Sequence, residues 1–243
     1  MCGRYFLTRP PAALARLFRT VDPVPNHPPR FNVAPTQESL VVRRNPETGA
    51  RHLDLLRWGL VPLWAKEASI GARMINARAE TLSEKPAYRD AYAKRRCLVP
   101  IDGFYEWAEL PGRTRRHPYA VAMADGSPMV LAGLWERWRG PDGSVLRSFT
   151  VVTCPATPRL APLHERMPVV LPEAAWPLWL GETEGDPASV LAPMDGAAFR
   201  IWPVSVRVNA VREDDRGLLD RDPSAPTLPG LGEADGPPPW PDG

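Results

Sequence analysis

The chain has 243 residues, of which 44% are hydrophobic, and this is enough for a substantial core in one or two domains; we expect one. No apolar run approaches the roughly 18 residues of a membrane-spanning helix, and the amino terminus lacks the continuous apolar stretch of a signal peptide. The three cysteines are widely spaced, and the four histidines show no metal-ligand spacing. We therefore expect a cytoplasmic protein with no membrane attachment, no disulfide framework, no cofactor and no bound metal.

The net charge of +2 hides an uneven distribution along the chain. Residues 1–180 contain 25 Lys and Arg against 16 Asp and Glu, whereas residues 181–243 contain 5 against 12. Arg makes up 27 of the 30 basic residues, and its planar guanidinium pairs with phosphate and stacks on bases. A basic body rich in Arg and Trp is compatible with nucleic-acid binding, although a coding bias explains the ratio of Arg to Lys equally well.

The first residues offer a reactive group. Removal of Met1, which is usual when a small residue follows, would leave Cys2 with a free α-amine and a free thiol on adjacent carbons. Both groups have reference pKa values of roughly 8 to 8.5, so each has an accessible reactive form near neutral pH. An aldehyde would form an imine with the amine, and the thiol would then close a five-membered thiazolidine. The alternative is that Cys2 is an ordinary second residue.

The first half of the chain alternates short strands with turns. Residues 4–7 are predicted as a strand, and Pro11 opens a helix with an apolar face. Residues 38–44 and 52–58 read as two strands joined by a turn at 45–49. Trp64 follows in a loop beside a Pro, where it is either a core anchor or a platform for an unstacked base.

The second half is mostly strand. A helix is predicted over 86–96, and the pattern at 118–123, 129–138 and 145–153, separated by tight turns, predicts an antiparallel meander. The remaining predicted elements are strands at 97–101 and 103–107, a short strand after His164, helices at 173–180 and 187–191, and a last strand at 200–206.

Two residues of this half are candidates for acid–base chemistry. Glu106 lies between two aromatic residues of a predicted strand, and its pKa would be raised if it faces a pocket. The alternative is an ordinary charge on the solvent face of an edge strand. His164 stands at a junction of loop and strand, where a histidine is either structural or functional.

From about residue 222 the composition changes. Residues 222–243 are rich in Pro and Gly and carry more acidic than basic residues, with little apolar content. We predict a domain over 1–221 and a disordered tail over 222–243.

Nine segments in order resemble one known family. They are MCGRY at the amino terminus, then NVAPT, RWGLVPLW, INARAET, DGFYEW, LAGLWE, FTVVT, LHERMPVVL and WPVSVRVN. Together they resemble the SOS response-associated peptidase family, whose members crosslink abasic sites and are also called 5-hydroxymethylcytosine-binding proteins. The resemblance runs from Cys2 to about Asn209.

The resemblance implies a fold and a reaction. The fold is a single α+β domain with a curved, barrel-like, mostly antiparallel sheet and peripheral helices. The reaction is the removal of Met1, followed by covalent bonding of Cys2 to the ring-opened abasic site in single-stranded DNA, with lyase-like chemistry. Met1 is removed either by the protein itself, as a thiol autopeptidase, or by a separate aminopeptidase. Asn76 would position the start of the chain, Glu106 would act as acid and base, and His164 would assist at the sugar hydroxyl.

The resemblance also implies how DNA is held. Arg4 and Arg78 would bind the phosphates beside the lesion, and Trp64 would stack near the bent strand. Single-stranded DNA carrying an abasic site is therefore the expected partner, with the protein acting as a monomer that is nucleoid-associated when bound.

Two other classes of protein remain open. Class II amidotransferases also begin with a processed Cys-Gly pair, but no glutamine-binding motif is found here. A plain single-stranded DNA-binding module would bind without any covalent bond and would be indifferent to Cys2.

Overall fold

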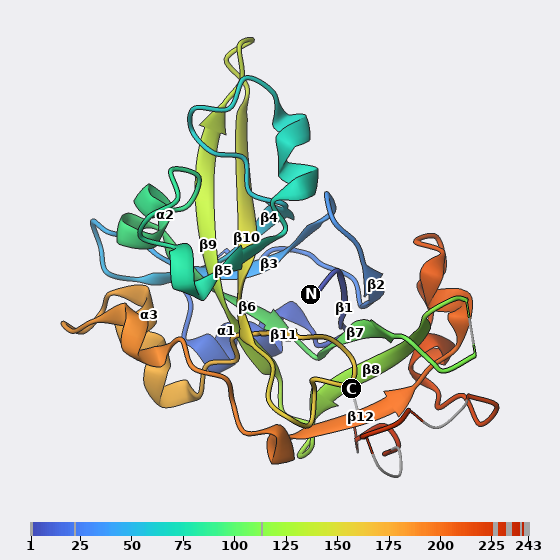
Figure 1. The fold of residues 1–243 in the computed structure, drawn as a ribbon. Helices are drawn as coiled ribbons and strands as arrows, with labels where there is room; N and C mark the ends of the chain where they lie inside the picture. The colour runs from blue at the N-terminus through green and yellow to red at the C-terminus, as the bar shows by residue number, and fades with distance from the viewer. Residues whose placement is uncertain are drawn as a thin grey trace.

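Two β-sheets form the body of the computed structural model, which describes residues 2–21, 23–112, 114–225, 228–231, 235–238 and 240 (Figure 1). In these residues the helices are α1 (Pro11–Phe18), α2 (Arg89–Lys94) and α3 (Trp176–Leu180). The strands are β1 (Arg4–Leu7), β2 (Arg30–Val33), β3 (Glu38–Arg44), β4 (Arg51–Trp58), β5 (Asn76–Arg78), β6 (Arg96–Ile101), β7 (Gly103–Ala108), β8 (His117–Met123), β9 (Met129–Arg139), β10 (Val145–Pro155), β11 (Arg166–Pro168) and β12 (Phe199–Pro203).

One sheet has the order β12-β8-β7-β1-β2 and is called here the N-terminal sheet. The other contains β10, β4, β3, β6 and β9 and closes on itself because β10 also pairs with β9; β11 and β5 add to β10. Most pairings are antiparallel, while β10 runs parallel to β4 and β5. The predicted fold class, α+β with a barrel-like and mostly antiparallel sheet, is confirmed.

Local sequence explains helix α1 and the turn between β3 and β4. Pro11 occupies the first turn of α1, where its missing N–H costs nothing, and Leu14 and Phe18 bury one face of the helix. The turn between β3 and β4 is held by Asn45, whose Oδ1 accepts from the N–H of Glu47 at 2.9 Å. The predicted hairpin is thus present, with β4 beginning one residue earlier than expected.

The predicted meander is confirmed for the antiparallel pair β9 and β10 and is wrong for β8. β8 pairs with β7 and β12 in the N-terminal sheet, whereas β9 pairs with β6 and β10 in the barrel. The turn at residues 124–128 carries the chain from one sheet to the other. Both strands are buried along most of their length, so each needs neighbours on both faces. The predicted helix over 86–96 is shorter, because Arg96 already belongs to β6 and pairs with Leu134.

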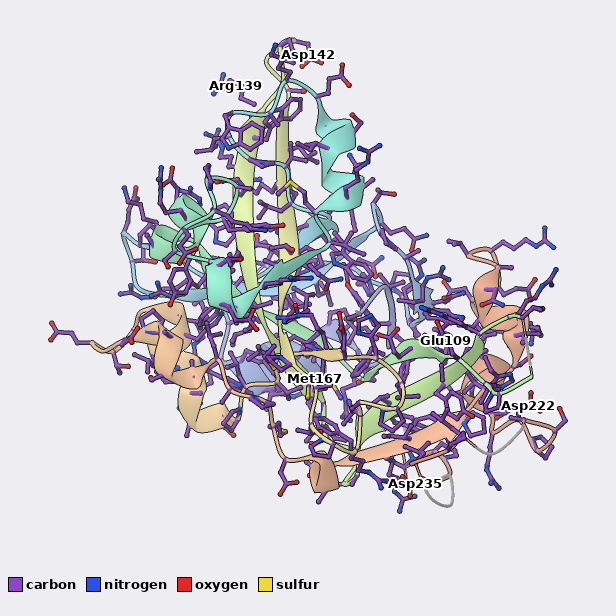
Figure 2. The ribbon with its side chains drawn as sticks, in the orientation of Figure 1. Glu109, Arg139, Asp142, Met167, Asp222 and Asp235 are labelled. Carbon is purple, nitrogen blue, oxygen red and sulfur yellow. The ribbon has the colours of Figure 1, made fainter. Side chains whose placement is uncertain are left out.

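The described part of the tail packs on the domain. Leu228 is 4% and Leu231 is 7% exposed, and the ring of Trp240 meets that of Phe6 with centroids 5.8 Å apart. Asp235, labelled in Figure 2, accepts from the N–H of Ile201 at 3.0 Å. A few apolar side chains thus place these residues against the domain, while the predicted disorder of the tail stays a prediction. The domain boundary at residue 221 stays a prediction.

The two sheets share a core at the start of the chain. Tyr5 of β1 packs against Trp58 of β4, with ring centroids 4.8 Å apart. Cys2, just before β1, belongs to the same buried cluster. Over the described residues, no helix is long and apolar enough to cross a membrane.

Candidate active site at the start of β1

Cys2 lies where the two sheets meet. β1 runs antiparallel to β7 with Arg4 opposite Tyr105, so the register brings Glu106 level with Gly3. From the barrel side, Nδ2 of Asn76 in β5 donates a hydrogen bond to the carbonyl oxygen of Cys2 at 2.8 Å. The structure thus brings together three of the residues predicted from the sequence, although they are far apart in the chain.

A tight loop delivers Asn76 to this position. The loop begins at Gly59, whose φ is +114°, and a Cβ there would lie 2.4 Å from the carbonyl oxygen of Gly71. Only glycine fits so close an approach with this backbone conformation. Beyond the loop, Asn76 pairs with Val151 of β10, and the hydroxyl of Tyr88 donates to the Asn76 carbonyl oxygen at 3.2 Å. The backbone of Asn76 is therefore fixed on two sides.

The thiol of Cys2 is completely buried. Burial raises its pKa to about 12, and the negative charge of Glu106 acts in the same direction. The thiol is thus protonated at neutral pH, because the charged form would lose its hydration. A reaction of Cys2 in this setting needs a nearby group to receive the thiol proton.

Glu106 is a buried carboxyl group with a raised pKa. It is 6% exposed, and burial is the largest cause of the shift. A hydrogen bond from the N–H of Trp107 to Oε1 at 3.2 Å opposes the shift. The carboxyl group therefore holds its proton to higher pH than an ordinary Glu, as a general acid near neutral pH requires.

Burial of Glu106 predicts a pH-dependent effect on stability. Because the pKa is higher in the folded than in the unfolded chain, the carboxyl favours folding below its ordinary pKa, and this is lost as pH rises through the folded value. Each unit of difference corresponds to about 1.4 kcal/mol. We expect Glu106→Gln to raise the free energy of unfolding at pH 7.5 and to change it less at pH 4.5, as measured by urea denaturation. The matched control is Glu109→Gln on an exposed side chain. A larger gain at pH 4.5 would contradict the assignment.

His164 lies in the segment between β10 and β11. Its Nδ1 accepts from the N–H of Arg166 at 2.9 Å, which leaves the proton of the neutral ring on Nε2. Burial lowers its pKa, and so does the positive charge of the chain's amino terminus.

Arg166 is a site residue that sequence reasoning missed. Its guanidinium pairs with both carboxylate oxygens of Glu80, at 3.0 and 2.9 Å, and donates to the carbonyl oxygen of Thr153 at 2.7 Å. These bonds fix the backbone that holds His164. The sequence shows Arg166 only as a neighbour of His164, since its partners come from distant segments.

Arg4 is less available than its predicted role requires. Its Nη1 donates to Oδ1 of Asn32 and to the carbonyl oxygen of Val208, both at 2.9 Å, and burial lowers its pKa. Asn32 is completely buried, and its Nδ2 donates to three carbonyl oxygens of the segment 208–213, those of Val208, Ala210 and Glu213. Asn32 therefore ties β1 to this late segment, a role that nothing in the sequence indicated.

The other two predicted DNA ligands are exposed. Arg78 ends β5, next to Thr153 of β10. Trp64 is 59% exposed and borders a hollow of about 530 Å³ together with Lys66, Ile70 and Arg73. Both can meet a ligand, but they are not part of the contact between Cys2 and Asn76.

No metal centre is found in the described part of the chain. There, no group of three or more His, Cys, Asp or Glu side chains is arranged to hold a metal ion.

Comparison with known proteins gives a consistent result. The family model for SOS response associated peptidase (SRAP) matches residues 1–211. The abasic site processing protein YoqW of Bacillus subtilis is 36% identical over 225 residues, covering 90% of this chain and 99% of that protein. The abasic site processing protein HMCES of Rattus norvegicus is 29% identical, covering 88% of this chain and 74% of that protein.

Solved structures show the same fold. A protein from Bacteroides thetaiotaomicron superposes with a TM-score of 0.80 at 20% identity, covering 91% of this chain and all of that one. A protein from Bordetella bronchiseptica superposes with a TM-score of 0.72 at 27% identity, covering 84% of this chain and all of that one. The chain belongs to the SOS response-associated peptidase family, as its sequence motifs predicted.

Proposed function

We propose that this protein recognises abasic sites in single-stranded DNA and bonds to them covalently through Cys2 after Met1 has been removed. Relatives named abasic site processing proteins support abasic-site processing as the general activity. The covalent step rests on one observation above all. The carbonyl oxygen of Cys2 accepts a hydrogen bond from the side-chain amide of Asn76. The strand register also places the buried carboxyl group of Glu106 level with the start of β1.

The proposed bonds can be written in full. The α-amine of Cys2 attacks the aldehyde carbon of the ring-opened sugar, and loss of one water gives an imine. The sulfur then adds to the imine carbon, forming a C–S bond while the thiol proton passes to the nitrogen. The product is a thiazolidine, and no oxidant or reductant is consumed.

The buried groups have distinct tasks in this scheme. Glu106 gives a proton to the departing hydroxyl during imine formation, takes one back from the nitrogen as the neutral imine forms, and relays the thiol proton to the nitrogen when the ring closes. His164, neutral and with its proton on Nε2, donates a hydrogen bond to the sugar oxygen that is freed when the sugar ring opens. Such donors stabilise the charge that develops in the transition state.

The side chain of Asn76 has a hydrogen-bond acceptor that is not used in the structure described here. Its Oδ1 is buried and has no hydrogen-bond partner among the described residues, while its Nδ2 holds the Cys2 carbonyl. A buried acceptor without a donor is costly. The α-amine that appears on Cys2 when Met1 is removed would supply the missing donor. Asn76 would thus hold both ends of the Cys2 backbone.

DNA binding in the proposal relies on phosphate contacts and stacking, because an abasic site has no base to read. Arg78 and Trp64 are exposed and suit these tasks, and Arg4 contributes charge while it braces β1 against β2. The affinity for single strands should therefore weaken as the salt concentration rises.

A denaturing gel tests the proposal. The purified protein is incubated with single-stranded DNA carrying one abasic site, and its intact mass is measured first to establish whether Met1 is absent. We expect a slower band that survives denaturation, formed by the processed protein and not by a form with an additional residue before Cys2. Binding under native conditions without any such band would contradict the covalent proposal and leave a non-covalent binding module.

A further inference from the structure

A second basic region lies beside the turn between β3 and β4. It contains a hollow of about 800 Å³ whose lining includes Arg44, Lys94 and Trp135. A smaller hollow of about 180 Å³ shares these three residues and also contains Arg96. We call the two together the β3–β4 groove. The shared residues show that the two hollows adjoin.

Part of the groove is a fixed flat surface. The guanidinium of Arg43 lies over the ring of Trp135, 4.2 Å from its centroid, and pairs with Asp54 at 2.8 Å. Arg95 pairs with the buried carboxylate of Glu136 at 2.6 Å. These ion pairs hold Arg43 and Arg95 in place, and the stack of guanidinium on indole offers a planar face.

Two cations of the groove remain available. In the part of the chain that the structure describes, no carboxylate lies within ion-pair distance of Arg44 or Lys94. Lys94 is exposed, and Arg44 is half-buried at the junction of the two hollows. Separated cations beside a planar surface are the features that bind successive phosphates and bases of a single strand.

The groove is linked to the site at Cys2 by one segment of chain. Arg78 ends β5 at that site, and the following residues lead through α2 to Lys94 (Figure 1). Lys85 and Arg89, which lie between them in the sequence, are exposed, and Arg89 pairs with Asp90 at 3.5 Å. Exposed basic side chains thus recur along the segment that joins the two regions.

We propose that the β3–β4 groove binds the phosphates of single-stranded DNA some nucleotides away from the abasic site. This extends the proposed function, because the same strand would occupy both regions. A groove of this kind would add affinity for long strands, with no preference for a lesion, and would leave the reaction of short strands unchanged.

The test compares strand lengths. Fluorescence anisotropy gives the dissociation constants of the whole protein for intact oligothymidylates of 10 and 40 nucleotides, across a range of salt concentrations. We expect the double variant Arg44→Glu/Lys94→Glu to lose affinity for the 40-mer by tenfold or more and for the 10-mer by less than twofold. The slope of log affinity against log salt should fall by about 1 to 1.5 for the 40-mer, because two phosphate contacts disappear.

A matched control carries the same change of charge elsewhere. Arg139→Glu/Arg147→Glu alters two exposed side chains near the end of the β9–β10 hairpin, where Figure 2 labels Arg139, and should leave both affinities near wild type. An equal loss for both lengths, or no loss, would overturn the proposal. A short abasic strand should react at the wild-type rate with the groove variant. If the wild-type protein forms no covalent product, the proposed function fails. The comparison of intact strands of two lengths still shows whether the groove binds DNA.

Discussion

Cys2→Ala is expected to form no product that survives denaturation with abasic single-stranded DNA. The amine of the variant can still form an imine, but without the thiol the ring cannot close, and the imine hydrolyses in the gel. The loss should be complete within detection. The variant and the wild-type protein are each incubated with the abasic strand, and denaturing electrophoresis measures the fraction of DNA that is crosslinked.

Chemical trapping separates this loss from loss of folding. Cyanoborohydride reduces an imine to a stable amine, so Cys2→Ala should give a band when the reductant is present and none when it is absent. The thiol is completely buried in an apolar cluster, and Ala occupies the same place with a small change of volume. An unreduced band from Cys2→Ala equal to that of wild type would locate the linkage at another residue.

Glu106→Gln is expected to slow covalent bond formation by about 10²- to 10⁴-fold, the range over which a positioned acid–base group acts. Gln keeps the acceptor for the N–H of Trp107 but cannot exchange a proton. Affinity for intact single strands should stay near wild type, because the side chain is buried and makes no phosphate contact in the proposal. Single-turnover rates from quenched samples measure the effect.

The dependence of the reaction rate on pH tests whether Glu106 acts as the acid. Burial raises the pKa of Glu106, so the protonated acid persists to higher pH than usual, and the rate should decline as pH rises through that value. Glu106→Gln should lack this decline. Glu109→Gln, which neutralises an exposed carboxylate just beyond β7, is the control and should keep both the rate and the profile. A decline of the same shape in Glu106→Gln would assign it to another group.

Elements set by short patterns were predictable from the sequence. The helix after Pro10 and the hairpin around Asn45 follow from proline, asparagine and apolar spacing within a few residues. The division of β8 and β9 between two sheets was not predictable in this way, because each strand's partners lie elsewhere in the chain. Only contacts across the whole fold select between a meander and a crossover.

The candidate site divides in the same manner. Cys2 and Glu106 were candidates from their own chemistry, whereas Asn76 was named only because its motif resembles a family. The hydrogen bond from Asn76 to Cys2 agrees with the positioning role that the resemblance implied. The bonds of Arg4 to Asn32 and Val208 depend on residues 28 and 204 positions away. No local pattern records such bonds, and the prediction of Arg4 as a free phosphate ligand did not anticipate them.

The link from Arg4 to Val208 also sets an order of events during synthesis. β1 leaves the ribosome first, yet it is paired on one side with β7 and braced by a carbonyl near the end of the domain. The packing around β1 is therefore complete only when almost the whole domain has been made.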